Sequence, residues 1–284
     1  MFNNTLDEKH YAETGSRGEP TAAELKEQVL ECVHTLRSST FGDEEGRESL
    51  ANILENCDPG HRCGSAACLM CGTAAKRFLV KRVDRLWPEP TPLKSFALIS
   101  PAFQRALGTL DSISFKSIRT LTRGWLESAG FSDLKAFGFI DLCHSIDRRT
   151  GKEEWSPHIH MVTPVEGSEG LTRALKATLE SGAQAPIPVR GVTVRDRSRQ
   201  ISYVFKPRPT RTVRYAASSG KAYPTKHWLK REQQVEALLW FGRYKALDRS
   251  VTINLGESIR QLKSSRSCAS PAHDIGRKRM ATQR

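Results

Sequence analysis

Hydrophobic residues recur with helical spacing near the start of the chain. Over residues 24–36, one helical face would carry the apolar residues Leu25, Val29, Cys32, Val33 and Leu36. This spacing predicts an amphipathic helix, and further helices are expected over residues 44–55 and 73–86. The third helix is basic, and Pro88 ends it because a proline disfavours helical geometry at the residue before it.

After a proline-rich hinge at residues 87–92, short extended runs replace the helical pattern. Strands are expected over residues 94–100, 134–144, 155–164 and 187–194. A polar segment with a Thr150-Gly151 turn separates the middle two, which predicts an antiparallel hairpin. Helices are expected over residues 112–129, 168–181 and 197–205. This order favours an α+β fold, in which helices pack on an antiparallel sheet.

The remaining C-terminal sequence is rich in basic residues. A last long helix is expected over residues 225–247, and the Gly- and Ser-containing segment before it is expected to be a loop. Residues 256–284 combine basic residues with many serines, a composition typical of a disordered tail.

Charge is unevenly distributed along the 284 residues. The chain has 44 Lys and Arg against 31 Asp and Glu, a formal net charge of +13. Residues 1–58 hold 13 acidic and 5 basic side chains, whereas residues 59–284 hold 39 basic and 18 acidic ones. A body with this excess of cations is typical of proteins that bind nucleic acid.

The sequence shows no sign of a membrane partner or of secretion. No apolar run approaches the roughly 18 residues that a membrane-spanning helix needs. The first 20 residues are polar and acidic, unlike the basic and then apolar pattern of a secretory signal. We therefore expect a cytoplasmic protein.

Four of the seven cysteines lie within fifteen residues, at Cys57, Cys63, Cys68 and Cys71, with His61 among them. In a reducing compartment such a group favours metal binding over disulfides. Zinc takes four sulfur or nitrogen ligands in a tetrahedron, so one of the five side chains is surplus. We expect the four thiolates to bind structural zinc, with His61 as the alternative ligand.

Two histidines alternate along the predicted strand at residues 155–164. Side chains of a strand point to opposite faces in turn, so His158 and His160 share one face while Ile159 and Met161 point into a core. Asp141 lies in the middle of the preceding strand and is the acid best placed to join them. Two imidazoles and a carboxylate can hold one divalent cation.

Tyr203 and Lys206 stand three residues apart in the last turn of a predicted helix. Residues at this spacing share a helix face. A lysine there favours ionisation of the phenol or steadies a phosphate, which suits a tyrosine nucleophile. The other four tyrosines are Tyr11, Tyr215, Tyr223 and Tyr244.

Taken in order, these motifs resemble a known family. The order is the cysteine-rich segment, the strand at residues 96–100, Asp141, the Pro157-His158-Ile159-His160 run and Tyr203-x-x-Lys206. Over residues 57–245 it resembles the rolling-circle replication initiators of bacterial plasmids and phages, in the HUH endonuclease superfamily. The resemblance implies a five-stranded antiparallel sheet with packed helices, preceded by a small zinc-binding helical segment.

The resemblance also implies an activity. Asp141, His158 and His160 would bind Mg²⁺ or Mn²⁺, Tyr203 would attack a phosphate of single-stranded origin DNA, and Lys206 would assist it. The products would be a 5′-phosphotyrosyl enzyme and a 3′-OH that primes rolling-circle DNA replication. A DNA polymerase would extend that primer. Because the chain has no P-loop for ATP hydrolysis, a host helicase would unwind the DNA.

The chain departs from the family at Arg199, because some members have a glutamate four residues before the tyrosine that helps to end replication. The alternatives are a single-tyrosine HUH transposase and, from another class, a zinc-containing nucleic-acid-binding protein without catalysis. We therefore divide the chain into an acidic N-terminal helical region with a flexible tail, a zinc-binding segment, an HUH endonuclease domain with a C-terminal helix, and a basic tail. Their bounds are residues 1–56, 57–87, 93–255 and 256–284.

Overall fold

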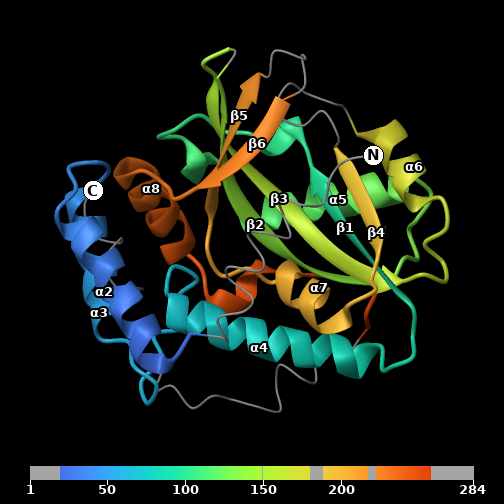
Figure 1. The fold of residues 1–284 in the computed structure, drawn as a ribbon, viewed down its shortest axis with the longest axis horizontal. Coiled ribbons are helices and arrows are strands. Elements are labelled where there is room, and N and C mark those ends of the chain that lie inside the picture. Colours follow the sequence, from blue (N-terminus) through green and yellow to red (C-terminus); the bar gives the residue numbers. More distant parts are fainter. Residues whose placement is uncertain (1–19, 149, 180–187, 217–221, 257–284) are drawn as a thin grey trace, which may run out of the picture. The chain divides into compact units, whose positions relative to one another are not determined.

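The computed structural model of the chain describes residues 20–148, 150–179, 188–216 and 222–256 (Figure 1). Its helices are α2 (Ala22–Arg37), α3 (Glu44–Glu55), α4 (Leu69–Leu86), α5 (Phe115–Ser128), α6 (Leu171–Thr178), α7 (Arg197–Val204) and α8 (Arg231–Gly242). Its strands are β1 (Leu93–Ile99), β2 (Ala136–Asp147), β3 (Glu153–Pro164), β4 (Val189–Thr193), β5 (Thr210–Ala216), β6 (Ala222–His227) and β7 (Ser250–Ile253). Short 3-10 turns are η1 (Pro101–Phe103), η2 (Leu110–Ser112) and η3 (Ala246–Arg249).

The fold is mixed α/β, with one seven-stranded sheet among the described residues. The strand order is β4-β1-β3-β2-β5-β6, and β7 also pairs with β2. The sheet is therefore larger than the five strands expected, and β5 runs parallel to β2, whereas the other pairs are antiparallel. Strands β5, β6 and β7 all come from the segment after α7, in which no strand was expected.

The β2–β3 hairpin is confirmed, and its register sets the geometry of the site. Asp141 pairs with His158, and Phe139 pairs with His160. Gly138 lies beside them where the two backbones approach closely. A Cβ atom at Gly138 would lie 2.3 Å from the carbonyl oxygen of His160, so this position accepts only glycine without a shift of the strands.

Two predictions for the C-terminal part are wrong. The expected loop before residue 225 contains β5 and β6, and the expected helix over residues 225–247 begins only at Arg231. Tertiary pairing explains both differences, because β5 adds to the edge of β2 and β6 then pairs with β5. At the start of α8, the Gln233 side chain accepts a hydrogen bond of 2.9 Å from the backbone N–H of Lys230.

The sheet separates an apolar core from a polar site. On one face, Ile140, Leu142, Ile159 and Met161 are fully buried in the core that includes α5 and α8. The opposite face carries Asp141, and α7 lies over this face between the sheet and α4 (Figure 1). Alternation along two neighbouring strands thus places ionisable groups under α7 while their sequence neighbours build the core.

The described residues up to Asn254 belong to one compact unit. Within it, α2 and α3 pack on each other and contact α4 and α8. None of the described helices has both the length and the apolar character needed to cross a bilayer. The tails expected at residues 1–20 and 256–284 lie almost entirely outside the described residues, and so does Tyr11.

Candidate active site and metal centres

Asp141, His158 and His160 meet on the face of the sheet under α7, and we call them the Asp-His-His site. Asp141 Oδ2 lies 3.4 Å from Nε2 of His158 and 3.7 Å from Nε2 of His160. The two Nε2 atoms are 3.1 Å apart. Three potential ligand atoms from neighbouring strands therefore converge on one point, the geometry that a shared cation requires.

Hydrogen bonds fix the orientation of two of these groups. Nδ1 of His158 lies 3.0 Å from the carbonyl oxygen of Ser156. Donation of the Nδ1 proton to that oxygen leaves the lone pair of Nε2 facing the site. Asp141 Oδ1 accepts a 2.8 Å hydrogen bond from the backbone N–H of Leu142, which leaves Oδ2 facing the histidines.

The protonation states of Asp141 and His160 are those of metal ligands, although Lys206 already lies beside the carboxylate. Burial would raise the pKa of Asp141, but Lys206 and then His158 and His160 outweigh burial and hold this pKa well below its usual range. Burial and then the charge of Lys206 hold the pKa of His160 well below its usual range. Asp141 is therefore ionised and His160 neutral near pH 7, the states in which both can ligate a metal.

Tyr203 and Lys206 lie directly against the Asp-His-His site. The rings of Tyr203 and His160 meet edge to face, with centroids 5.5 Å apart. Lys206 follows the end of α7, and its Nζ lies 3.3 Å from Asp141 Oδ2 and 3.7 Å from the centroid of the Tyr203 ring. Burial would lower the pKa of Lys206, but Asp141 and Tyr203 raise it. Lys206 thus keeps a positive charge between the carboxylate and the phenol.

Arg249 holds the chain around Lys206, a role that the sequence did not indicate. Its side chain is 1% exposed and donates hydrogen bonds to the carbonyl oxygens of Ile140, Lys206 and Pro207 at 3.1, 3.0 and 3.0 Å. The guanidinium also packs on the rings of Phe139 and Phe241, at 4.2 and 4.4 Å from their centroids. It therefore ties the end of α7 to the strand that carries Asp141.

Ile140 needs this donor because the edge of β2 is divided between two strands. The first part of β2, up to Phe139, pairs with β7, and the part from Cys143 onward pairs with β5. Neither strand pairs with the residues between, where Asp141 lies. Arg249 and the Asp141 carboxylate hydrogen-bond the backbone there instead.

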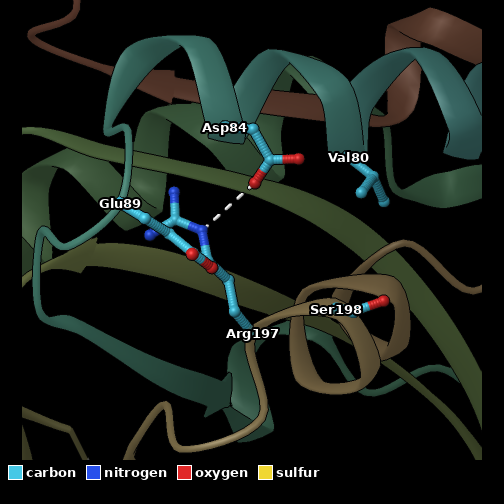
Figure 2. Close-up of a pocket in the computed structure, with 5 residues that line it drawn as sticks. All are labelled: Val80, Asp84, Glu89, Arg197 and Ser198. Atoms are coloured by element: carbon cyan, nitrogen blue, oxygen red, sulfur yellow. Dashed lines mark hydrogen bonds and ion pairs between the residues drawn. The ribbon is translucent and has the colours of Figure 1, made fainter.

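The beginning of α7 is fixed by a second arginine beside a cavity (Figure 2). Arg197 pairs with Asp84 of α4 at 3.1 Å and donates to the carbonyl oxygens of Trp87 and Thr91. The cavity, of about 350 Å³, is lined by Val80, Asp84, Glu89, Arg197 and Ser198. It contains no residue of the Asp-His-His site, so we assign it no catalytic role. The short helix that carries Tyr203 is thus held at both ends.

Cys57, Cys63, Cys68 and Cys71, which we call the cysteine cluster, gather their sulfur atoms between α3 and the start of α4. All four sulfurs lie within 4.8 Å of one another, and three pairs are separated by 3.5 to 3.7 Å. A tetrahedron with Zn–S distances of about 2.3 Å has sulfur–sulfur edges of about 3.8 Å. The cluster can therefore hold a metal such as zinc.

Local backbone geometry supports this cluster. The backbone N–H groups of Cys63 and Gly64 donate to the sulfurs of Cys57 and Cys71 at 3.4 and 3.2 Å. Helix α4 begins at Leu69, four residues earlier than expected, so Cys71 lies in its first turn. His61 is outside the cluster, since its side chain is 89% exposed and its Nδ1 faces Asp58.

The structure also places the rival tyrosines. Tyr244 is half-buried and stacks on the core residue Phe115, with ring centroids 4.0 Å apart. Tyr215 and Tyr223 pair across β5 and β6, but their side chains lie outside the described residues. Among the described tyrosine side chains, therefore, only that of Tyr203 contacts the Asp-His-His site.

No family model, curated protein or solved structure matches this chain. The chemistry of the site therefore follows from its side chains. A neutral imidazole and an ionised carboxylate can ligate a divalent cation, and such a cation supplies a Lewis acid for a phosphoryl oxygen. A phenol and an ammonium group stand beside that position, which is an arrangement suited to attack on a phosphodiester.

Proposed function

We propose that this chain cleaves single-stranded DNA through Tyr203 and acts as an initiator of rolling-circle replication of the HUH type. The observation that carries the proposal is the contact of the Tyr203 ring with His160 and with Lys206, directly beside Asp141. Asp141, His158 and His160 would hold Mg²⁺ or Mn²⁺, which polarises the scissile phosphate when bound. The cysteine cluster would hold a structural zinc.

In the proposed step, the phenolic oxygen of Tyr203 forms a bond to the phosphorus and the bond from phosphorus to the 3′ oxygen breaks. The phenolic proton passes to solvent, and the leaving 3′ oxygen takes up a proton from solvent. The products are a 5′-phosphotyrosyl enzyme and a free 3′-OH. Lys206 holds the phenol and adds positive charge beside the phosphate, where negative charge develops. A polymerase would extend the 3′-OH, and a host helicase would separate the strands.

The distribution of charge supports a nucleic-acid substrate. Residues 197–231, which surround Tyr203 in the sequence, contain ten Lys and Arg and no Asp or Glu. Lys226 of β6 extends this positive charge to the nucleophile, since its Nζ lies 5.7 Å from the centroid of the Tyr203 ring. Phosphate groups bound near these residues would place the DNA backbone within reach of the phenol.

The test is an assay for a covalent adduct with single-stranded oligonucleotides that together represent many sequences. With Mg²⁺ or Mn²⁺ the wild-type chain should form an adduct that survives denaturation, and peptide mapping should locate it at Tyr203. Tyr203→Phe should abolish the adduct, while Tyr244→Phe, which makes the same change at a tyrosine packed on Phe115, should leave it intact. An adduct mapped to Tyr215 or Tyr223 would contradict the assignment of the nucleophile.

The same assay separates this proposal from the two alternatives. A zinc-containing nucleic-acid-binding protein without catalysis would bind the oligonucleotides and form no adduct with either cation. The cysteine cluster is the observation that favours that class. A single-tyrosine transposase would form the same adduct but would then join the bound strand to a second DNA end, and an initiator would instead support extension of the 3′-OH by a polymerase.

A further inference from the structure

Trp228 is the most exposed large hydrophobic side chain among the described residues. Its side chain is 75% exposed, whereas Trp87, Trp155 and Trp240 are each at most 7% exposed. A single exposed apolar residue carries no meaning by itself. The surroundings of this indole, however, distinguish it from the other exposed apolar side chains.

A cation holds the indole in place. The guanidinium carbon of Arg208 lies over the Trp228 ring, 5.4 Å from its centroid. Arg208 is itself partly buried, and burial lowers its pKa, an effect that Cys32 and Glu31 of α2 offset only in part. A partly buried arginine over the ring favours one orientation of the indole, and the large exposed area leaves room for a second flat group to stack on it.

Trp228 also stands close to the nucleophile. It directly follows His227, the last residue of β6, and Lys226 two residues earlier has its Nζ 5.7 Å from the Tyr203 ring centroid. Residues two apart in an extended chain are separated by about 7 Å. The indole is therefore within the length of a few nucleotides of the phosphate that Tyr203 would attack.

We propose that Trp228, oriented by Arg208, is a stacking platform for an unpaired base of single-stranded DNA. This inference rests on the proposed function for the identity of the substrate. The chemistry of this surface favours DNA as the ligand. The exposed ring can stack on a base, and the ten Lys and Arg of residues 197–231, which include no Asp or Glu, can bind the phosphates that join the bases. Bases of a duplex are already stacked and paired, so the platform selects single strands.

The experiment measures binding of short oligonucleotides to the full chain in the Tyr203→Phe background, where no adduct forms. Single-stranded DNA should quench the intrinsic tryptophan fluorescence, and a duplex of the same sequence should quench it much less. Trp228→Phe should remove the quenching but bind within about threefold of the parent. Trp228→Ala should bind about tenfold more weakly, because base–aromatic stacking is lost.

Two controls make the loss specific. Val192→Ala changes another exposed apolar residue, 54% exposed on β4 at the opposite edge of the sheet, and should leave binding unchanged. The dependence of binding on salt should be the same for Trp228→Ala and the parent, since no phosphate contact is removed. A single abasic nucleotide placed along the oligonucleotide should reproduce the tenfold loss at one position and should add nothing to Trp228→Ala.

The outcomes distinguish this inference from the proposed function. Binding by Trp228→Ala within twofold of the parent, or quenching that persists in Trp228→Phe, would overturn the stacking platform even where the wild-type chain forms the adduct. Quenching that depends on Trp228 would support the platform even where the wild-type chain forms no adduct, and the nuclease alone would then be wrong.

Discussion

The cysteine cluster draws all its ligands from fifteen consecutive residues, whereas the Asp-His-His site combines two strands and is completed by α7. The cysteines need only a loop and the first turn of α4 to meet. The second site exists only after β2, β3 and α7 have packed together. A bound metal would therefore organise the local fold at the cysteine cluster, while at the Asp-His-His site the fold organises the ligands before any metal arrives.

The two regions also differ in how they carry charge. The cysteine cluster consists of four thiols, which would lose their protons when a metal binds. The Asp-His-His site already contains cations, because Lys206 and Arg249 lie 3.3 and 3.8 Å from the Asp141 oxygens. If both sites hold metal as proposed, metal loss should affect stability most at the cluster and adduct formation most at the Asp-His-His site.

The largest effect is expected from the double variant Cys68→Ser, Cys71→Ser. Structural zinc in small domains contributes about 10 kcal/mol of folding free energy, so the variant should lose its zinc and the segment before Trp87 should lose protection from hydrogen exchange. Metal analysis and exchange mass spectrometry measure both. Cys143→Ser is the matched control outside the cluster. Full zinc retention in the double variant would remove the contrast between the two regions.

His160→Ala should act on catalysis and spare stability. Loss of a metal ligand should slow adduct formation by at least about a hundredfold, while single-stranded DNA affinity and the midpoint of denaturation change little. Affinity persists because many Lys and Arg side chains bind phosphates. His158→Ala should behave alike. Normal adduct formation by both variants would show that the site needs no cation.

Arg249→Met should weaken both the fold and the site. The variant leaves three carbonyl oxygens without their donor and removes a buried cation near Asp141, so the free energy of unfolding should fall by about 3 kcal/mol. Arg249→Lys keeps the positive charge but loses the several N–H donors of the guanidinium, so its free energy of unfolding should lie between those of Arg249→Met and the wild type. Denaturant unfolding and the single-turnover rate report the two losses. Arg243→Met, at an exposed arginine of the same region, should change neither.

His144 provides the smallest effect and a contrast on the same strand. It lies on the apolar face of β2, fully buried with its ring against Trp155. Burial and then Arg211 lower its pKa to about 4, so the folded chain favours neutral His144. Stability should be complete above pH 6.5 and fall as the pH decreases toward 4, by about 2 kcal/mol at pH 5. His144→Phe should flatten this part of the pH profile of unfolding, and an unchanged profile would contradict the assignment.

The local elements of the fold could be predicted from the sequence. The extended runs of β2 and β3 and the turn between them predicted the hairpin, and the helical period was clear in α2. The β5–β6 hairpin could not be predicted in this way, because its strands are basic and polar and owe their conformation to pairing with β2. At the edge of a sheet, the β-propensity of the residues has little influence, and pairing with the neighbouring strand determines the conformation.

The candidate site was predictable only where neighbours in sequence carry it. His158 and His160 share a face because they lie two apart on one strand, and the register then places Asp141 opposite them. Arg249 gave no such signal. Its partners lie 109 residues away at Ile140 and more than 40 residues away at Lys206 and Pro207, and no pattern in a single sequence relates positions so distant.

The hydrogen bond between Asp141 and the backbone of its own strand would favour one mode of ligation by this carboxylate. Oδ1 is engaged by the N–H of Leu142 at 2.8 Å, while Oδ2 alone faces His158, His160 and Lys206. In the proposed site, Asp141 would therefore offer a cation one oxygen atom rather than two. A monodentate carboxylate occupies a single coordination position, which leaves more of the coordination sphere to oxygen atoms from outside the protein.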